Sequence, residues 1–198
     1  MHARPDPAFP EPAAARAAAL IRQVLARAPV EEDAGHAENT LHWLLRLDPA
    51  ADPALRLAAL AHDIERARAR RLRRQRFASY DDFKARHAEI GARITRRLLH
   101  VAGVEESVRE EACRLVRRHE VGGDPRSDLL KDADSLSYFD HNLPYYYRRE
   151  GWEETLRRAR WGYSRLSARA RAHYDQITPA SEQLRQLLVE ARRLEQPC

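Results

Sequence analysis

Long apolar runs are absent from this sequence, and cysteine, glycine and lysine are scarce. No apolar stretch approaches the roughly 18 residues of a membrane span, so we expect no membrane partner. The 2 cysteines, Cys113 and Cys198, are too few for a disulfide framework and favour a reducing, cytoplasmic interior. We recognise no glycine-rich phosphate loop and no Ser-His-Asp or Cys-His nucleophile pattern. These absences argue against membrane-spanning, disulfide-rich and P-loop proteins.

Helix-forming residues dominate what is present, namely Ala, Leu, Arg and Glu. No segment alternates with a period of two, so the predicted class is all-α. We expect one domain over residues 1–198, with an N-terminal helical extension (1–32), a core (33–141) and C-terminal helices (142–198). Prolines, glycines and capping residues predict helices over 11–28, 33–48 with Asp33 as cap, 52–64, 79–103 with Ser79 or Asp81 as cap, 105–120, 124–141, 144–177 and after Pro179.

The formal net charge is +5, and arginine supplies almost all of the positive charge. Lys84 and Lys131 are the only lysines, while arginine is dense from Arg66 to Arg76. A basic surface favours phosphate-bearing partners. Three interpretations of the Arg66–Arg76 cluster stay open: a solvated basic helix, a gate for anionic substrates, or a nucleic-acid contact.

Histidine and aspartate interrupt apolar helix faces on five separate predicted helices. Neutral imidazole and carboxylate groups that converge from separate helices are ligands that Mn, Fe, Co, Ni or Zn accept. His62 and Asp63 are adjacent, so on a helix their side chains would diverge by about 100° and could lie on either side of an ion. The candidate ligands are His36, His62, Asp63, His87, His119 and Asp134.

The order His…His-Asp…His…His…Asp resembles the HD-domain superfamily of metal-dependent phosphohydrolases, which are all-helical. The resemblance covers about residues 33–140 and includes "HDIER" and "LLKDADSLSYF". It implies an HD-like helical bundle in which His36, His62, Asp63 and Asp134 bind one metal, and in which His87 and His119 match the histidines that two-metal members add. "HDIER" is also similar to the HDIGK-like motif of the HD-GYP phosphodiesterases, but the tyrosine of GYP is missing, so cyclic-dinucleotide cleavage is not assigned.

The resemblance implies a phosphomonoesterase or phosphodiesterase that acts on a nucleotide or another small phosphate ester through a metal-activated water. Asp63 would bridge two ions, and Arg66 and Lys131 would neutralise the phosphate. One or two divalent ions per chain are expected. The alternatives are a non-catalytic regulator that binds a nucleotide or nucleic acid on the same scaffold, and a di-iron oxygenase.

Several residues keep two interpretations. His87 and His119 are either ligands of a second metal or pocket residues that bind the substrate. Glu32, one helical turn before His36, is either a further ligand or an exposed acid of the first helical turn. Asp132 is the rival of Asp134 as the last ligand. The aromatic segment with Tyr145–Tyr147 is either a lid or a seam between the C-terminal helices and the core.

Overall fold

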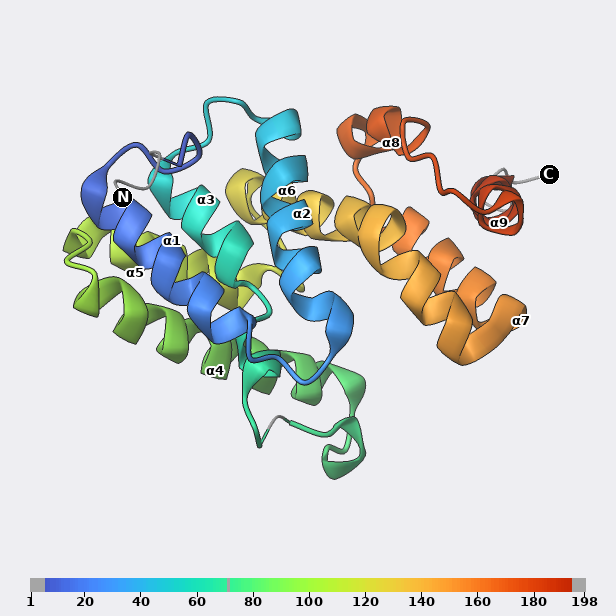
Figure 1. The fold of residues 1–198 in the computed structure, drawn as a ribbon. Helices are drawn as coiled ribbons and strands as arrows, with labels where there is room; N and C mark the ends of the chain where they lie inside the picture. The colour runs from blue at the N-terminus through green and yellow to red at the C-terminus, as the bar shows by residue number, and fades with distance from the viewer. Residues whose placement is uncertain (1–5, 71, 194–198) are drawn as a thin grey trace.

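The computed structural model of the chain describes residues 6–70 and 72–193, and every regular element within these ranges is a helix (Figure 1). The predicted all-α class is confirmed. Arg71 and Cys198 lie outside the described residues. None of the described helices combines the length and the hydropathy that crossing a membrane requires. The α-helices are α1 (Pro12–Leu25), α2 (Glu31–Leu47), α3 (Pro53–Ala61), α4 (Tyr80–Val101), α5 (Glu106–Arg118), α6 (Pro125–Ser137), α7 (Leu143–Ser164), α8 (Ala168–Tyr174) and α9 (Glu182–Arg193).

Helix α3 lies at the centre of the bundle, where it packs against α1, α2, α5 and α6. Its last five residues, 57–61, have no exposed surface, and three of them are alanines. Small side chains allow neighbouring helices to approach closely, and burial of the apolar surface stabilises the packing. The end of α3 therefore delivers the following residue, His62, to the middle of the molecule.

Side-chain caps fix where α3, α4 and α6 begin. The Asp52 carboxylate accepts the backbone N–H of Leu55 at 3.0 Å at the start of α3. The Ser79 hydroxyl accepts the N–H of Asp82 at 3.0 Å before α4, so Ser79 and not Asp81 is the cap. Asp124 caps α6 in the same way. Each cap satisfies a backbone donor that the helix leaves free.

The continuous helix predicted over 144–177 is wrong. Gly151 has φ 75° and interrupts α7, so the chain reverses direction and two arms run back along one another (Figure 1). The Phe139 ring lies against Gly162 on the returning arm, where a Cβ would come within 3.0 Å of it. Glycine adopts a positive φ at little cost, which explains the reversal within an otherwise helical pattern. A separate helix, α8, then begins after Ser167.

The aromatic segment with Tyr145–Tyr147 belongs to this hairpin. Tyr147 packs against the core, and the Tyr146 hydroxyl donates a hydrogen bond to Glu154 on the opposite arm at 3.1 Å. Tyr145 lies beside the His141 ring, with 5.6 Å between the centroids. These contacts support the seam interpretation for Tyr146 and Tyr147.

Candidate metal centre

The His62–Asp63 doublet lies where α3 ends. The sequence predicts a helix that continues through it, but α3 stops at Ala61, and Asp63 takes φ −101° and ψ 14°. A short 3-10 helix follows over Ile64–Ala67. The divergence of about 100° expected on a continuous helix therefore does not apply. The two side chains are instead close to one another, and His62 Nε2 lies 3.9 Å from Asp63 Oδ2.

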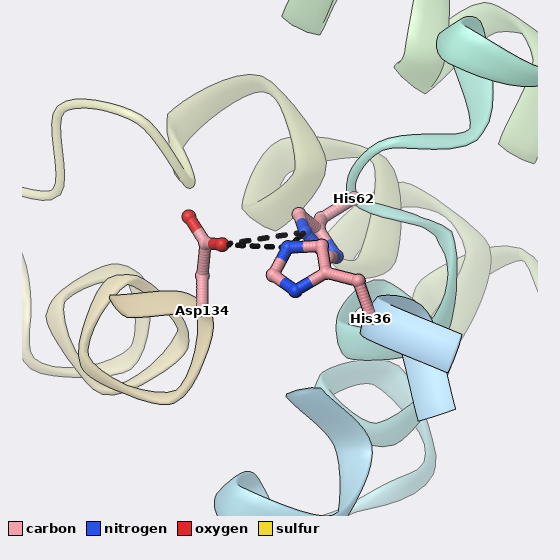
Figure 2. Close-up of side chains that lie close together, drawn as sticks. All are labelled: His36, His62 and Asp134. Atoms are coloured by element: carbon pink, nitrogen blue, oxygen red, sulfur yellow. Dashed lines mark hydrogen bonds and ion pairs between the residues drawn. The ribbon is translucent and has the colours of Figure 1, made fainter. Parts of the chain in front are cut away.

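The first group of candidate ligands, called the Asp134 triad, consists of His36, His62 and Asp134 (Figure 2). They come from α2, the end of α3, and α6. Asp134 Oδ1 lies 3.1 Å from His36 Nε2 and 3.5 Å from His62 Nε2, and the two Nε2 atoms are 3.2 Å apart. Ligand atoms that each lie roughly 2.1 Å from one ion, at right angles, are roughly 3 Å apart. The triad therefore has the spacing of one face of a metal's coordination shell.

The second group, called the Asp63 triad, consists of Asp63, His87 and His119. Asp63 Oδ1 lies 2.8 Å from His87 Nε2 and 3.8 Å from His119 Nε2. The His62 and His119 rings are 5.3 Å apart, so the two triads are neighbours. Asp63 faces both, because its other oxygen points toward His62. The structure thus brings all six predicted ligands together, in two sets of three.

Two of the histidines are oriented by the helix ends that carry them. His62 is the C-cap of α3 and His119 is the C-cap of α5. Each donates its Nδ1–H to a carbonyl three residues earlier, Ala59 or Val116, at 2.8 Å. The last carbonyls of a helix lack partners within the helix, so they are available as acceptors. This donation leaves each Nε2 lone pair directed at the site.

The other two histidines are oriented by side chains. The Nδ1–H of His36 donates to the Ser137 hydroxyl at 2.8 Å, and that hydroxyl donates to the His36 carbonyl. The Nδ1–H of His87 donates to Glu65 at 3.0 Å, and the other Glu65 oxygen accepts the N–H of Leu72. Such partners fix the tautomer and the ring direction of histidine ligands. All four histidines therefore present Nε2 to the site.

The electrostatics of the site favour positive charge. Burial disfavours the charged forms, but it is outweighed: Asp63 and Asp134 raise the pKa of His62 to about 9, and Asp63 and Glu65 raise that of His87 to about 10. The same contacts hold the pKa values of Asp63 and Asp134 well below their usual range. Carboxylates that attract protons onto neighbouring imidazoles also attract a metal cation, which competes with those protons.

One family comparison covers most of the chain. A family model described as a domain of unknown function, DUF4202, matches residues 13–188. The chain belongs to this family. Comparisons with curated proteins and with solved structures gave no match. All six candidate ligands fall inside the DUF4202 region, so the centre is part of the domain that defines the family.

Two further residues of this DUF4202 domain were expected to neutralise phosphate, and the structure separates them. Arg66 lies at the site, where its Nη2 contacts the buried Asp33 at 2.8 Å and its Nη1 lies 3.6 Å from Asp63. Asp33 is therefore the partner of Arg66, and the prediction that it caps α2 is wrong, because α2 begins two residues earlier. Lys131 points elsewhere: its Nζ contacts Asp128 at 2.9 Å.

Two alternative ligands have other partners. Glu32 is buried, and it accepts a hydrogen bond from Arg149 at 2.5 Å, so it serves as an ion-pair partner on the side of α7. Asp132 accepts from the backbone N–H of Ser167 at 3.0 Å and also from its hydroxyl. That pair of contacts joins α6 to the start of α8. Asp134, two residues later, faces the opposite side and reaches the triad.

A cavity of about 1340 Å³ opens over both triads. Asp63 and Asp134 lie in its wall, together with aromatic side chains from α4 and α7. The Arg66–Arg76 cluster forms another part of the wall, and it is not the basic helix that one interpretation expected. Arg66 belongs to the short 3-10 helix Ile64–Ala67, a three-residue 3-10 helix follows at Arg74–Arg76, and the other described residues of the cluster are not helical. The arginines of the cluster that line the cavity are Arg66, Arg70, Arg73, Arg74 and Arg76.

The residues that sequence analysis missed are the ones that orient the ligands. Ser137 lies three residues after Asp134, so the two share a helix face. This spacing could have indicated that Ser137 lies near the site. No sequence signal reveals that the carbonyls of Ala59 and Val116 are acceptors, because that role depends on where α3 and α5 end.

Proposed function

We propose that this chain is a metal-dependent phosphohydrolase of the HD type that acts on a nucleotide or another small phosphate ester. The observation that carries the proposal is the pair of triads, in which four Nε2 atoms and two carboxylates face one interior below a large cavity. Mixed imidazole and carboxylate ligands suit divalent transition metals such as Mn, Fe, Co, Ni or Zn. A divalent ion bound there would lower the pKa of water and withdraw charge from a phosphoryl group.

The protein's own residues would hold and orient the reactants. His36, His62 and Asp134 would hold one ion, and His87 and His119 with Asp63 would hold a second. Asp63 is the natural shared ligand, because its two oxygens face different triads.

Arg66 is the group in this proposal that neutralises the reacting phosphate. Asp33 fixes one side of its guanidinium, and Arg66 itself lies in the cavity wall, about a third exposed. A guanidinium can donate two parallel hydrogen bonds to phosphate oxygens. Lys131 has no part in the proposed site, since it is absent from the cavity wall.

The first test is elemental analysis of protein purified without chelator, followed by phosphate release from mononucleotides and a phosphodiester in the presence of Mn²⁺. We expect about two ions per chain, by the two-triad geometry, and metal-dependent turnover. His62→Ala should lose both. A His62→Ala protein that keeps its metal content and turnover would refute the assignment.

Two other results would replace the proposal. Oxygen uptake by the iron-loaded protein, without phosphate release, would indicate an oxygenase. Salt-sensitive binding of nucleotide or nucleic acid, without hydrolysis at any metal, would indicate a binding regulator.

A further inference from the structure

A cluster of three cations surrounds Trp161 at the edge of the cavity. Trp161 lies on the returning arm of α7, and the residue is 37% exposed. The Arg165 guanidinium carbon lies 4.4 Å from the ring centroid, that of Arg158 lies 4.9 Å away, and Lys84 Nζ lies 5.5 Å away. Each cation is within the range of a cation–π contact. Like charges held this close repel one another unless an anion balances them.

The carboxylates within reach do not balance this charge. Glu120 Oε2 lies 3.2 Å from Lys84 Nζ and 3.7 Å from Arg165 Nη1, so a single carboxylate serves two cations. Among the described residues, no carboxylate oxygen lies within ion-pair distance of Arg158; its neighbours are the rings of Tyr138 and Trp161 and the Tyr80 hydroxyl at 3.5 Å. The cluster therefore has one carboxylate for three cations: Glu120 pairs with Lys84 and Arg165, and Arg158 has no acidic partner among the described residues.

The Trp161 cluster adjoins the Asp63 triad. Lys84 precedes His87 by three residues on α4, which places the two one helical turn apart on nearly the same face. Glu120 directly follows His119. Arg158, Trp161 and Arg165 line the same cavity as Asp63 and His87. A molecule with one phosphate at the metal centre could thus extend a second anionic group to Arg158.

We infer that Arg158, supported by Arg165 and Lys84, forms a second anion subsite that binds an additional phosphate group of the substrate. This inference rests on the proposed function and narrows it to phosphate esters that carry at least two phosphates. The cavity is larger than the roughly 300–1,000 Å³ of typical small-molecule sites, which suits such a ligand. Arg158 is a specificity residue in this scheme, because it contacts a phosphate that does not react.

The test compares the binding of AMP, ADP and adenosine 3′,5′-bisphosphate to the Mn²⁺-loaded protein by isothermal titration calorimetry, with each nucleotide supplied as its phosphorothioate analogue to slow hydrolysis. The two ligands with a second phosphate distinguish a position adjacent to the first phosphate, as in the diphosphate ADP, from a position across the ribose, as in the 3′,5′-bisphosphate. We expect at least one of them to bind about tenfold more tightly than AMP, as a charge-assisted contact predicts. Arg158→Gln should reduce that ratio to about twofold or less and leave AMP binding nearly unchanged.

The matched control is Arg157→Gln, which removes the same charge from the neighbouring position of α7. Arg157 is exposed and pairs with Glu154, and it does not line the cavity. The inference is overturned if Arg158→Gln keeps the wild-type ratio, or if both variants lose it equally, since that would indicate a diffuse electrostatic effect. A wild-type ratio near one for both ligands overturns it without any variant, even if Arg158→Gln does not fold.

The binding measurement is independent of turnover. If the protein prefers a ligand with two phosphates but hydrolyses nothing, the proposed function is refuted and the subsite is retained. Hydrolysis of nucleotides without this binding preference would refute the subsite and support the proposed function. A single-stranded RNA oligonucleotide that binds more tightly than every nucleotide, with equal losses in both variants, would replace the subsite by a nucleic-acid surface.

Discussion

The two triads contain the same kinds of ligand but differ in what lies behind them. The Asp134 triad is backed by neutral groups, namely the Ser137 hydroxyl and the Ala59 carbonyl. Behind the Asp63 triad lies a second carboxylate, Glu65, which accepts the Nδ1–H of His87 and is itself buried. The comparison teaches that identical ligand types can form sites of unequal charge. We expect the Asp63 triad to bind a divalent ion more tightly, because a carboxylate partner makes an imidazole more basic.

The largest expected effect comes from the carboxylate that faces both triads. Asp63→Ala should lower the metal content from about two ions per chain to near zero, because Asp63 reaches His87 and also faces His62. Asp134→Ala should remove one ion, because the candidate ligands that Asp134 contacts are the two histidines of its own triad. Elemental analysis after dialysis against Mn²⁺ measures both variants. Loss of only one ion from Asp63→Ala would show that Asp63 is not a shared ligand.

A smaller effect is expected from the groups behind the ligands. Glu65→Gln should weaken the tighter metal-binding step by roughly 10–100-fold, because His87 loses its anionic partner. Ser137→Ala should weaken the other step by less, since it removes a neutral hydroxyl. Calorimetric titration of each variant with Mn²⁺ resolves the two steps. If Ser137→Ala weakens metal binding more than Glu65→Gln does, the predicted order of metal affinity of the two triads is reversed.

The smallest expected effect is a pH dependence of stability in the metal-free protein. The folded-state pKa values of His62 and His87 are raised to about 9 and about 10, above the value of about 6.5 expected in the unfolded chain. Their protonation therefore stabilises the fold fully below about pH 6.5, and this contribution is lost as the pH rises through about 9 for His62 and about 10 for His87.

Thermal unfolding in the presence of chelator measures this effect. The difference in Tm between wild type and His87→Ala should be larger at pH 6.5 than at pH 10, and the corresponding difference for His62→Ala should shrink at lower pH than that for His87→Ala. A difference that stays constant across the range would mean that these imidazoles are neutral in the folded protein.

The sequence was most informative where chemistry interrupts a helical pattern. Histidine or aspartate on an otherwise apolar face is costly to bury without a partner. The sequence pattern therefore indicates a functional role for His36, His87, His119 and Asp134. The sequence does not predict that these residues form two triads, because the grouping depends on how α2, α4, α5 and α6 pack together with α3.

Predictions failed where a local pattern had to reveal a tertiary contact. The helical pattern runs through Gly151 although the chain reverses there, because one permissive residue is enough for a turn. Asp33 has the chemistry of a helix cap, but Arg66 provides a stronger partner from a distant part of the chain. Lys131 has the right charge and lies on the right helix, yet its side chain is directed to Asp128.

The dispersal of the ligands along the chain also orders events during protein synthesis. The Asp63 triad is complete once His119 has been added, because its other members lie earlier in the sequence. The Asp134 triad waits for α6, which also supplies Ser137 to orient His36. A nascent chain thus acquires the binding groups of the more negative triad first, and the second triad is assembled only when α6 packs against α2. The order of the helices along the polypeptide therefore sets an order in which the centre can mature.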